Sequence, residues 1–249
     1  MQVAQGVEML ELPAMLMNGP GTLCPALLWD RQDIVLVDAG LPGMLQQFFE
    51  AMAKAGVPLH RLTRVIITHH DLDHIGSLGE LQRNVPHHVD ILAHGDEVPY
   101  IQGERLPIKM TPEMLARMEE QMKGLPEERR QAMQAMRESW KALKLKVDQR
   151  ISDDEILPFC GGVQVIHTPG HTPGHICLYL QASKTLIAGD ALFVENGNLA
   201  PPPAFINADP SMAIASLKKL TRFDIADIIA YHGGLFRDDC NMRLGEIIQ

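Results

Sequence analysis

The residues best suited to chemistry stand together after residue 68. The segment is Thr68-His69-His70-Asp71-Leu72-Asp73-His74. Five of the six residues that follow Thr68 carry a side chain that can bind a metal ion. An apolar, β-branched run precedes them and is typical of a buried strand. Because the backbone beyond a strand is no longer held in the sheet, a loop there can direct such side chains to one point. Imidazole and carboxylate ligands together suit zinc, iron, manganese or cobalt.

Three further segments each offer one candidate ligand at the end of a strand-like run. His171 follows Pro169-Gly170, Asp190 follows Gly189, and His232 precedes Gly233. A single histidine beside glycine is usually an ordinary loop residue, but four such sites at strand ends are not expected by chance. We therefore predict that distant parts of the chain meet at one metal-binding site.

The elements that must position these residues alternate between short strands and helices. Runs rich in Val and Ile predict strands at residues 22–29, 33–37, 64–68, 89–93, 163–168, 175–180, 185–188 and 225–231. Helices are predicted at residues 45–55, 78–83 and 211–220. Ser77 and Glu80 form a capping-box pattern for the second helix, and Asp209-Pro210 is a start signal for the third. Tyr231 precedes His232 in a predicted strand, which places the two side chains on opposite faces. Such alternation indicates an α/β layered fold.

Residues 96–156 interrupt this pattern with helical periodicity. Met114, Met118 and Met122 share one face of a predicted helix, and a second helix is predicted to begin at Pro126. We predict a helical insertion within a single domain of residues 1–249. Its methionine face packs against the main body, forms a lid over the substrate, or contacts a second copy in a homodimer.

The composition narrows the classes of function. The chain has 22 Lys and Arg against 31 Asp and Glu, a net charge of -9. This balance argues against a nucleic-acid or anionic-membrane partner. The sequence shows neither a signal peptide nor a membrane span, and its four scattered cysteines indicate neither a disulfide framework nor a zinc finger. We expect a cytoplasmic protein that acts on a small molecule.

As a set, the motifs resemble the metallo-β-lactamase superfamily. The usual first motif of that family is His-x-His-x-Asp-His. Here it reads His69-x-Asp71-x-Asp73-His74, with Asp71 in place of the second histidine. The other motifs match as Val37-Asp38-Ala39-Gly40, Gly170-His171, Gly189-Asp190 and His232-Gly233. The resemblance covers nearly the whole chain apart from the insertion, and it implies an αββα sandwich.

The resemblance also implies two divalent metal ions and their ligands. One ion is held by His69, Asp71 and His171, the other by Asp73, His74 and His232, and Asp190 bridges them. A register that uses His70 as the ligand would spoil the spacing to the rest of the motif. Asp71 makes the loaded site neutral, where the all-histidine pattern leaves one positive charge. Zinc is the expected metal, but the additional carboxylate makes the site harder and more tolerant of iron or manganese.

The implied reaction is hydrolysis. Metal ions lower the pKa of a bound water, and the hydroxide attacks a carbonyl or phosphoryl centre. Asp190 is expected to move the proton, and Asp73 is the second candidate catalytic residue. An ester, lactone or thioester is the expected substrate, with a phosphodiester as the alternative. Two other hypotheses stay open: a flavodiiron-like di-iron oxidoreductase that needs a separate electron donor, and a binding protein without turnover.

Four residues near the motifs have no firm role in the sequence. His175 either orients a ligand through hydrogen bonds or simply begins a strand. His94 faces the pocket or solvent, and Tyr100 packs at the rim or reaches over the metals to stabilise an oxyanion. His70 is expected to point away from the site or to contact its surroundings.

Overall fold

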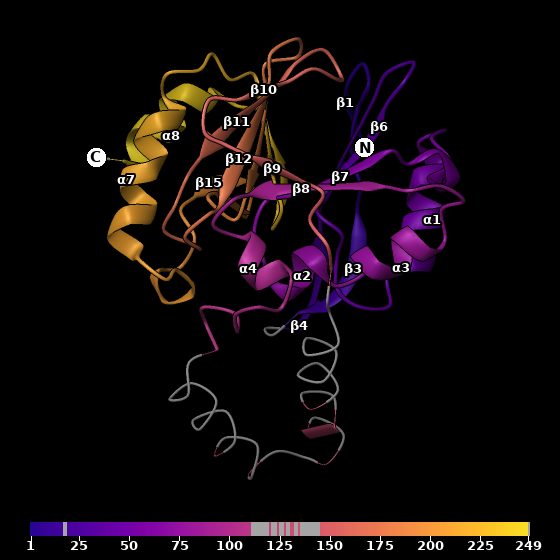
Figure 1. The fold of residues 1–249 in the computed structure, drawn as a ribbon. Coiled ribbons are helices and arrows are strands. Elements are labelled where there is room, and N and C mark those ends of the chain that lie inside the picture. The colour runs from indigo at the N-terminus through magenta and orange to yellow at the C-terminus, as the bar shows by residue number, and fades with distance from the viewer. Residues whose placement is uncertain are drawn as a thin grey trace.

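Two β-sheets packed face to face form the body of the molecule, and helices cover both outer faces (Figure 1). The computed structural model describes residues 1–16, 19–110 and 145–248, together with residues 120, 124, 127, 130, 131 and 134. The predicted αββα sandwich is confirmed. Met114, Met118, Met122 and Pro126 of the predicted insertion lie outside the described residues. The lid and homodimer hypotheses for that segment stay predictions.

The first sheet has seven strands in the order β1-β2-β5-β6-β7-β8-β9. They are β1 (Gln2–Ala4), β2 (Val7–Met9), β5 (Ala26–Trp29), β6 (Ile34–Val37), β7 (Arg64–Ile67), β8 (Asp90–His94) and β9 (Gln149–Ile151). The last four strands in that order run parallel, so their carboxyl ends lie along one edge. β9 pairs with β8, so Gln149–Ile151, which the sequence predicts to lie in the helical insertion of residues 96–156, are part of the first sheet.

The second sheet has six strands in the order β10-β11-β12-β13-β16-β17. They are β10 (Ile156–Leu157), β11 (Val163–His167), β12 (Ile176–Leu180), β13 (Thr185–Gly189), β16 (Asp227–Ala230) and β17 (Gly234–Phe236). Strands β13 and β16 are parallel neighbours, so the residues that follow them lie close together. Two hairpins complete the strands: β3 (Leu12–Leu16) with β4 (Gly19–Leu23), and β14 (Phe193–Glu195) with β15 (Asn198–Ala200).

The strand predicted at residues 22–29 is divided into β4 and β5. Pro25 lies between them and has no N–H group to donate to a ladder. The N–H of Cys24 donates instead to the carbonyl of Tyr231, 2.9 Å away. This bond joins the N-terminal hairpin to the segment that carries His232.

The helices lie on the outside of the sandwich and at the end where the loops gather (Figure 1). They are α1 (Leu45–Lys54), α2 (Leu72–Ile75), α3 (Leu78–Arg83), α4 (Val98–Ile101), α7 (Pro210–Leu220) and α8 (Cys240–Ile247), with 3₁₀ turns at Leu59–Arg61 and Ala204–Ile206. Asp209 caps α7 as predicted, because its carboxylate accepts the N–H of Met212 at 2.9 Å. The capping box at Ser77 is wrong: the Ser77 hydroxyl donates to the Leu41 carbonyl and accepts the N–H of Met44.

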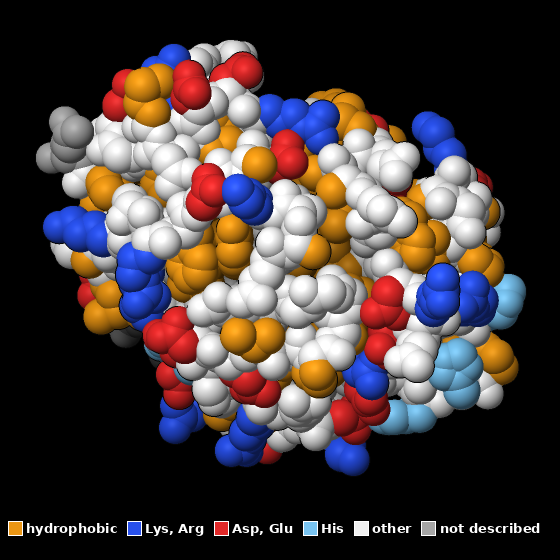
Figure 2. Space-filling view, turned by 90° about the horizontal axis from the view of Figure 1, so that it is seen from above, with side chains coloured by type: hydrophobic (Ala, Val, Ile, Leu, Met, Phe, Trp, Pro, Cys, Tyr) orange, Lys and Arg blue, Asp and Glu red, His pale blue; other side chains and the backbone are white. Residues whose placement is uncertain are grey.

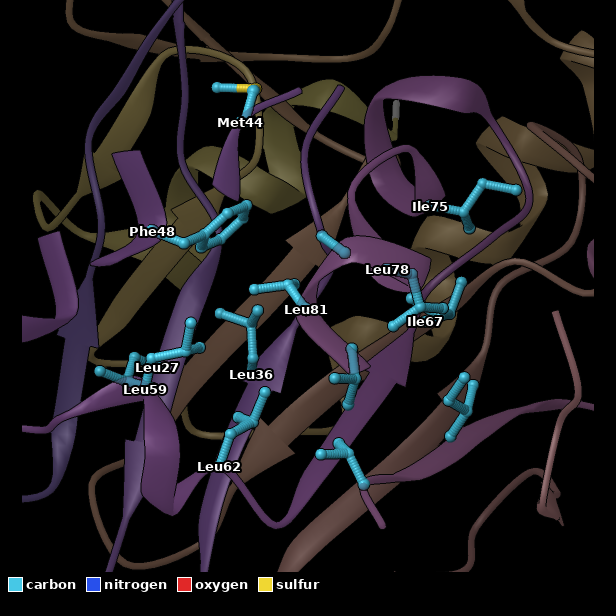
Figure 3. Close-up of a cluster of buried hydrophobic side chains, with 14 of the residues drawn as sticks. Leu27, Leu36, Met44, Phe48, Leu59, Leu62, Ile67, Ile75, Leu78 and Leu81 are labelled. Atoms are coloured by element: carbon cyan, nitrogen blue, oxygen red, sulfur yellow. The ribbon is translucent and has the colours of Figure 1, made fainter. Parts of the chain in front are cut away.

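Three apolar layers hold this architecture together. Side chains of both sheets, such as Val37, Ile66 and Leu178, form the layer between the sheets. Helices α1 and α3 bury Phe48 and Leu81 against the outer face of the first sheet, with the other side chains of Figure 3. A matching layer lies under α7 and α8. The stacked layers fix the strand ends, and through them the loops that carry the candidate ligands.

The surface carries charges of both signs. On the face shown in Figure 2, Lys and Arg side chains are interspersed with Asp and Glu side chains. Within the described part of the chain, no helix combines the length and the apolar composition that a bilayer span requires.

Candidate metal centre

The structure brings all seven predicted site residues together. His69 lies just beyond β7, Asp71 directly precedes α2, and Asp73 and His74 are on α2. His171 comes from the loop between β11 and β12, Asp190 follows β13, and His232 follows β16 with one residue between. Both sheets therefore contribute to the site, and the shared apolar layer between the sheets holds the two contributions in register.

The donor atoms form two groups that share one carboxylate. The groups are position A, defined as His69, Asp71 and His171, and position B, defined as Asp73, His74 and His232. Within each group the donor atoms lie within 4.8 Å of one another. One oxygen of Asp190 lies 3.4 Å from His171 Nε2, and the other lies 3.3 Å from His74 Nε2. Asp190 therefore faces both positions.

The spacing of these atoms fits metal coordination. Metal–ligand bonds of about 2.0–2.2 Å place tetrahedral ligands roughly 3.3–3.6 Å apart. His69 Nε2 lies 3.5 Å from Asp71 Oδ2, and His232 Nε2 lies 3.3 Å from Asp73 Oδ2. Among the described residues, four buried side-chain polar atoms have no hydrogen-bond partner, and three of these are His69 Nε2, His74 Nε2 and Asp190 Oδ1. Buried polar atoms are rarely left unpaired, so this convergence indicates a cation site.

Neighbouring groups contact Nδ1 of three of the histidines and thereby turn Nε2 toward the site. His74 Nδ1–H donates to Asp38 at 2.9 Å. His69 Nδ1 lies 3.0 Å from the Thr68 hydroxyl, which in turn donates to Asp38 at 2.8 Å. His171 Nδ1 lies 3.1 Å from the side-chain oxygen of Asn207. Such partners fix the tautomer that leaves a lone pair for a metal ion.

His175 supports Asp190 rather than joining the ligands. Its Nε2 accepts the backbone N–H of Asp190 at 3.0 Å, and its Nδ1 lies 2.9 Å from the Thr168 hydroxyl. Burial, together with the nearby His171, holds the pKa of His175 well below its usual range, so the ring is neutral. A Cβ on Gly189, whose φ is +52°, would lie 2.8 Å from His175 Nε2. Glycine at position 189 therefore permits this close support.

Asp190 is an anion in this setting. Burial alone would raise its pKa, but the His232 and His74 imidazoles lower it well below the usual range. At position A, burial and the neighbouring His74 lower the pKa of His69, so its Nε2 stays unprotonated. The site thus combines an ionised carboxylate at its centre with at least one imidazole that has a free lone pair.

A buried network around Glu97 was not predicted from the sequence. Glu97 is fully buried, and one of its carboxylate oxygens accepts the backbone N–H of His70 at 2.8 Å and the His70 Nδ1–H. The other oxygen accepts the Thr172 hydroxyl and the Gly174 N–H, both at 2.7 Å. Glu97 therefore ties the loop that carries His69 to the loop that carries His171. The other ring nitrogen of His70, Nε2, accepts the N–H of Ile108. Because both ring nitrogens are hydrogen-bonded, His70 has no nitrogen available to bind a metal ion.

Lys109 is the second residue that the sequence did not indicate. Its ammonium contacts the Asp71 carboxylate and lies 2.8 Å from His171 Nε2, so it touches two of the three residues of position A. No local pattern marks this residue, because it is 38 positions away from Asp71 in the chain.

The remaining aromatic candidates lie around the site. Tyr100 stacks on His70 with ring centroids 4.4 Å apart, so it packs beneath the loop. His94 stacks on His167 at 4.1 Å and belongs to neither position. The prediction that Tyr231 turns away from the site is wrong: its hydroxyl donates to the Asp73 carbonyl, and its ring lies 3.9 Å from that of His74. Tyr231 follows the last residue of β16, where strand alternation no longer applies.

A pocket of about 560 Å³ opens beside position B. Its wall combines His232 with apolar residues of the N-terminal strands and of β17, among them Met9, Leu16, Cys24 and Leu235. Thr22 and Glu11 also line it. The pocket thus brings apolar and polar side chains together next to His232.

Comparisons with known proteins agree with this geometry. Residues 26–232 match the model of the Metallo-beta-lactamase superfamily. The chain is 27% identical to Probable metallo-hydrolase YflN of Bacillus subtilis over 221 residues, which cover 82% of this chain and 76% of that protein. A shorter stretch of 71 residues is 37% identical to N-acyl homoserine lactonase of Bacillus thuringiensis and covers 27% of each chain.

Solved structures support the fold. The metallo-beta-lactamase family protein TTHA1429 from Thermus thermophilus aligns with a TM-score of 0.70 and 24% identity, covering 99% of this chain and 79% of that one. A metallo-beta-lactamase from Pontibacter korlensis aligns with a TM-score of 0.68 and 14% identity, covering 100% of this chain and 95% of that one. Since the family model spans most of the sequence, this protein belongs to the metallo-beta-lactamase superfamily.

Proposed function

We propose that this protein is a metal-dependent hydrolase that cleaves an ester, lactone or thioester. The observation that carries the proposal is the pair of donor groups, positions A and B, joined through Asp190 at the spacing of metal ligands. The names of relatives support hydrolysis, since one is a probable metallo-hydrolase and another an N-acyl homoserine lactonase. We propose two divalent ions, with zinc as the metal to test before iron or manganese.

The contacts of each residue indicate its role in the proposed reaction. When bound, the ions supply a nucleophile at neutral pH and polarise the substrate carbonyl. Asp190 reaches both positions and is ionised, so its carboxylate can accept a proton between them. Asp73 Oδ2 lies 3.3 Å from His232 Nε2, so these two atoms face the same point and would bind one ion together. His175 and Asp38 orient the ligands without touching the reacting atoms.

The pocket beside His232 favours a substrate with an uncharged, partly apolar group. Its walls of Met9, Leu16 and Leu235 suit an acyl chain, whereas the Glu11 carboxylate and the Met1 ammonium, 4.0 Å apart, offset each other's charge. This is our reason to place esters and lactones before phosphodiesters.

A substrate panel on metal-loaded protein tests the proposal. The protein is stripped with a chelator, reloaded with Zn²⁺, Mn²⁺ or Fe²⁺, and assayed against aryl esters, acyl homoserine lactones, a thioester and a phosphodiester. We expect metal-dependent hydrolysis of a carboxylic substrate, and its loss in Asp190→Asn. Asp224→Asn, on an exposed residue, is the matched control. Preferential turnover of the phosphodiester, or no hydrolysis with any metal, would contradict the proposal.

A further inference from the structure

Lys109 brings a positive charge into position A. Its ammonium contacts the carboxylate of Asp71 and lies 2.8 Å from His171 Nε2. Asp71 Oδ2 and His171 Nε2 are also two of the ligand atoms that a metal ion at position A would need. Among the described residues, no Lys or Arg makes a corresponding contact with Asp73, His74 or His232 of position B.

The backbone next to Lys109 is anchored to the site. The N–H of Ile108 donates to His70 Nε2 at 3.3 Å, and the other nitrogen of that ring donates to the buried Glu97. Tyr100 stacks on the same ring at 4.4 Å, so the His70 ring that anchors Ile108 is itself held in place. A lysine on a segment fixed in this way stays close to position A even when its side chain swings aside.

We propose that Lys109 is an internal competitor for position A, held there by Asp71. The ammonium and a metal ion cannot both occupy the space between Asp71 Oδ2 and His171 Nε2. A cation that enters position A must therefore break the Lys109–Asp71 pair, whereas a cation at position B displaces no such group. Position B fills with high affinity, and position A binds its ion more weakly. This inference rests on the proposed metal centre but not on any particular substrate.

Titration of the metal-free protein with Co²⁺ or Zn²⁺ tests the inference. Ion binding is followed by cobalt absorption and by competition with a chromophoric chelator. We expect one tight and one weaker ion in the unaltered protein. Lys109→Met should tighten the weaker ion by at least about tenfold and leave the tight ion unchanged, because a unit charge next to the cation is removed. Lys146→Met, on a lysine whose side chain is 83% exposed, should change neither.

A second pair of variants shows whether Asp71 holds the competitor. In an Asp71→His background, Lys109 no longer has the Asp71 carboxylate as a partner. The gain in affinity for the weaker ion that Lys109→Met produces should therefore shrink to less than about threefold. Two ions of equal affinity that Lys109→Met leaves unchanged would overturn the inference, and so would an equal gain in both backgrounds. Lys109→Gln serves as the second neutral variant, and circular dichroism confirms that each variant folds. Because the readout is metal affinity, an inactive protein that binds metal as expected would refute the proposed function alone.

Discussion

Replacement of Glu97 by alanine should destabilise the protein severely without touching any predicted ligand. The carboxylate accepts four hydrogen bonds in a fully buried setting, from His70 twice, from Thr172 and from Gly174. Alanine leaves all four donors without an acceptor. Each buried donor left unpaired costs about 1–3 kcal/mol, although the four costs do not simply add. We expect Glu97→Ala to lower the free energy of unfolding by about 3–5 kcal/mol, because several buried donors lose their acceptor at once.

Urea unfolding of the metal-free protein, followed by circular dichroism, measures this loss. Glu104→Gln is the matched control, because Glu104 is exposed on the segment that follows α4, and it should change stability by less than about 0.5 kcal/mol. The urea dependence of the free energy should be the same in all three proteins. A loss below about 1 kcal/mol in Glu97→Ala would refute the view that this carboxylate holds the two ligand loops together.

The difference in stability between the unaltered protein and Glu97→Ala should also depend on pH in a defined direction. Burial raises the pKa of Glu97, but its bonds with His70, Thr172 and Gly174 lower it below its ordinary value of 4.5. A depressed carboxyl pKa adds stability that is present above the unfolded-state pKa and is lost as the pH falls through the folded-state value. The stability gap between the unaltered protein and Glu97→Ala should therefore be constant above about pH 4.5 and shrink in stronger acid. A gap that widens on acidification would contradict this reasoning.

Three further predictions concern the metal centre and its pocket. Asp71→Ala should lower metal content and hydrolysis together, the latter by about 10- to 100-fold; unchanged metal content in elemental analysis would mean that the register of the first motif is wrong. Thr22→Lys should raise KM for long-chain esters far more than for an acetyl ester, because each buried CH₂ contributes about 0.8 kcal/mol to binding; equal KM changes for both esters would exclude this pocket as the acyl site. Burial lowers the pKa of His232, but Asp190 and Asp73 raise it to about 10. Metal loading near neutral pH should therefore release a proton from His232, and this release should decline as the pH rises through about 10. Potentiometric titration during metal loading measures the released proton.

The core strands were predictable because their side chains carry the pattern that burial imposes. β7 contains the run Val65-Ile66-Ile67 and β13 the run Leu186-Ile187-Ala188, and such consecutive buried apolar residues are typical of strands covered on both faces. Short strands such as β14 and β15 were missed, because three half-exposed residues carry no such pattern. The limits of β5 depended on a bond between Cys24 and Tyr231, which no local sequence window contains.

The candidate ligands were predictable for a different reason. His69, Asp71, Asp73 and His74 lie within six residues of one another, so their spacing is visible in a short window. Glu97 and Lys109 reach the site only through the tertiary fold, across 27 and 38 residues. A single Glu or Lys has no distinctive spacing, so only the assembled structure shows that one is buried between two loops and that the other touches a ligand.

Lys109 also changes the electrostatic interpretation of the first motif. The sequence predicts a neutral loaded centre, because Asp71 adds one negative charge to the usual ligand set. The Lys109 ammonium lies against that carboxylate and supplies one positive charge, which restores the balance of the all-histidine pattern. The segment anchored through Ile108 and His70 keeps this charge close even when a metal ion displaces the ammonium. The tolerance of iron or manganese that Asp71 alone suggests should therefore be small while Lys109 is present, and it should increase in Lys109→Met.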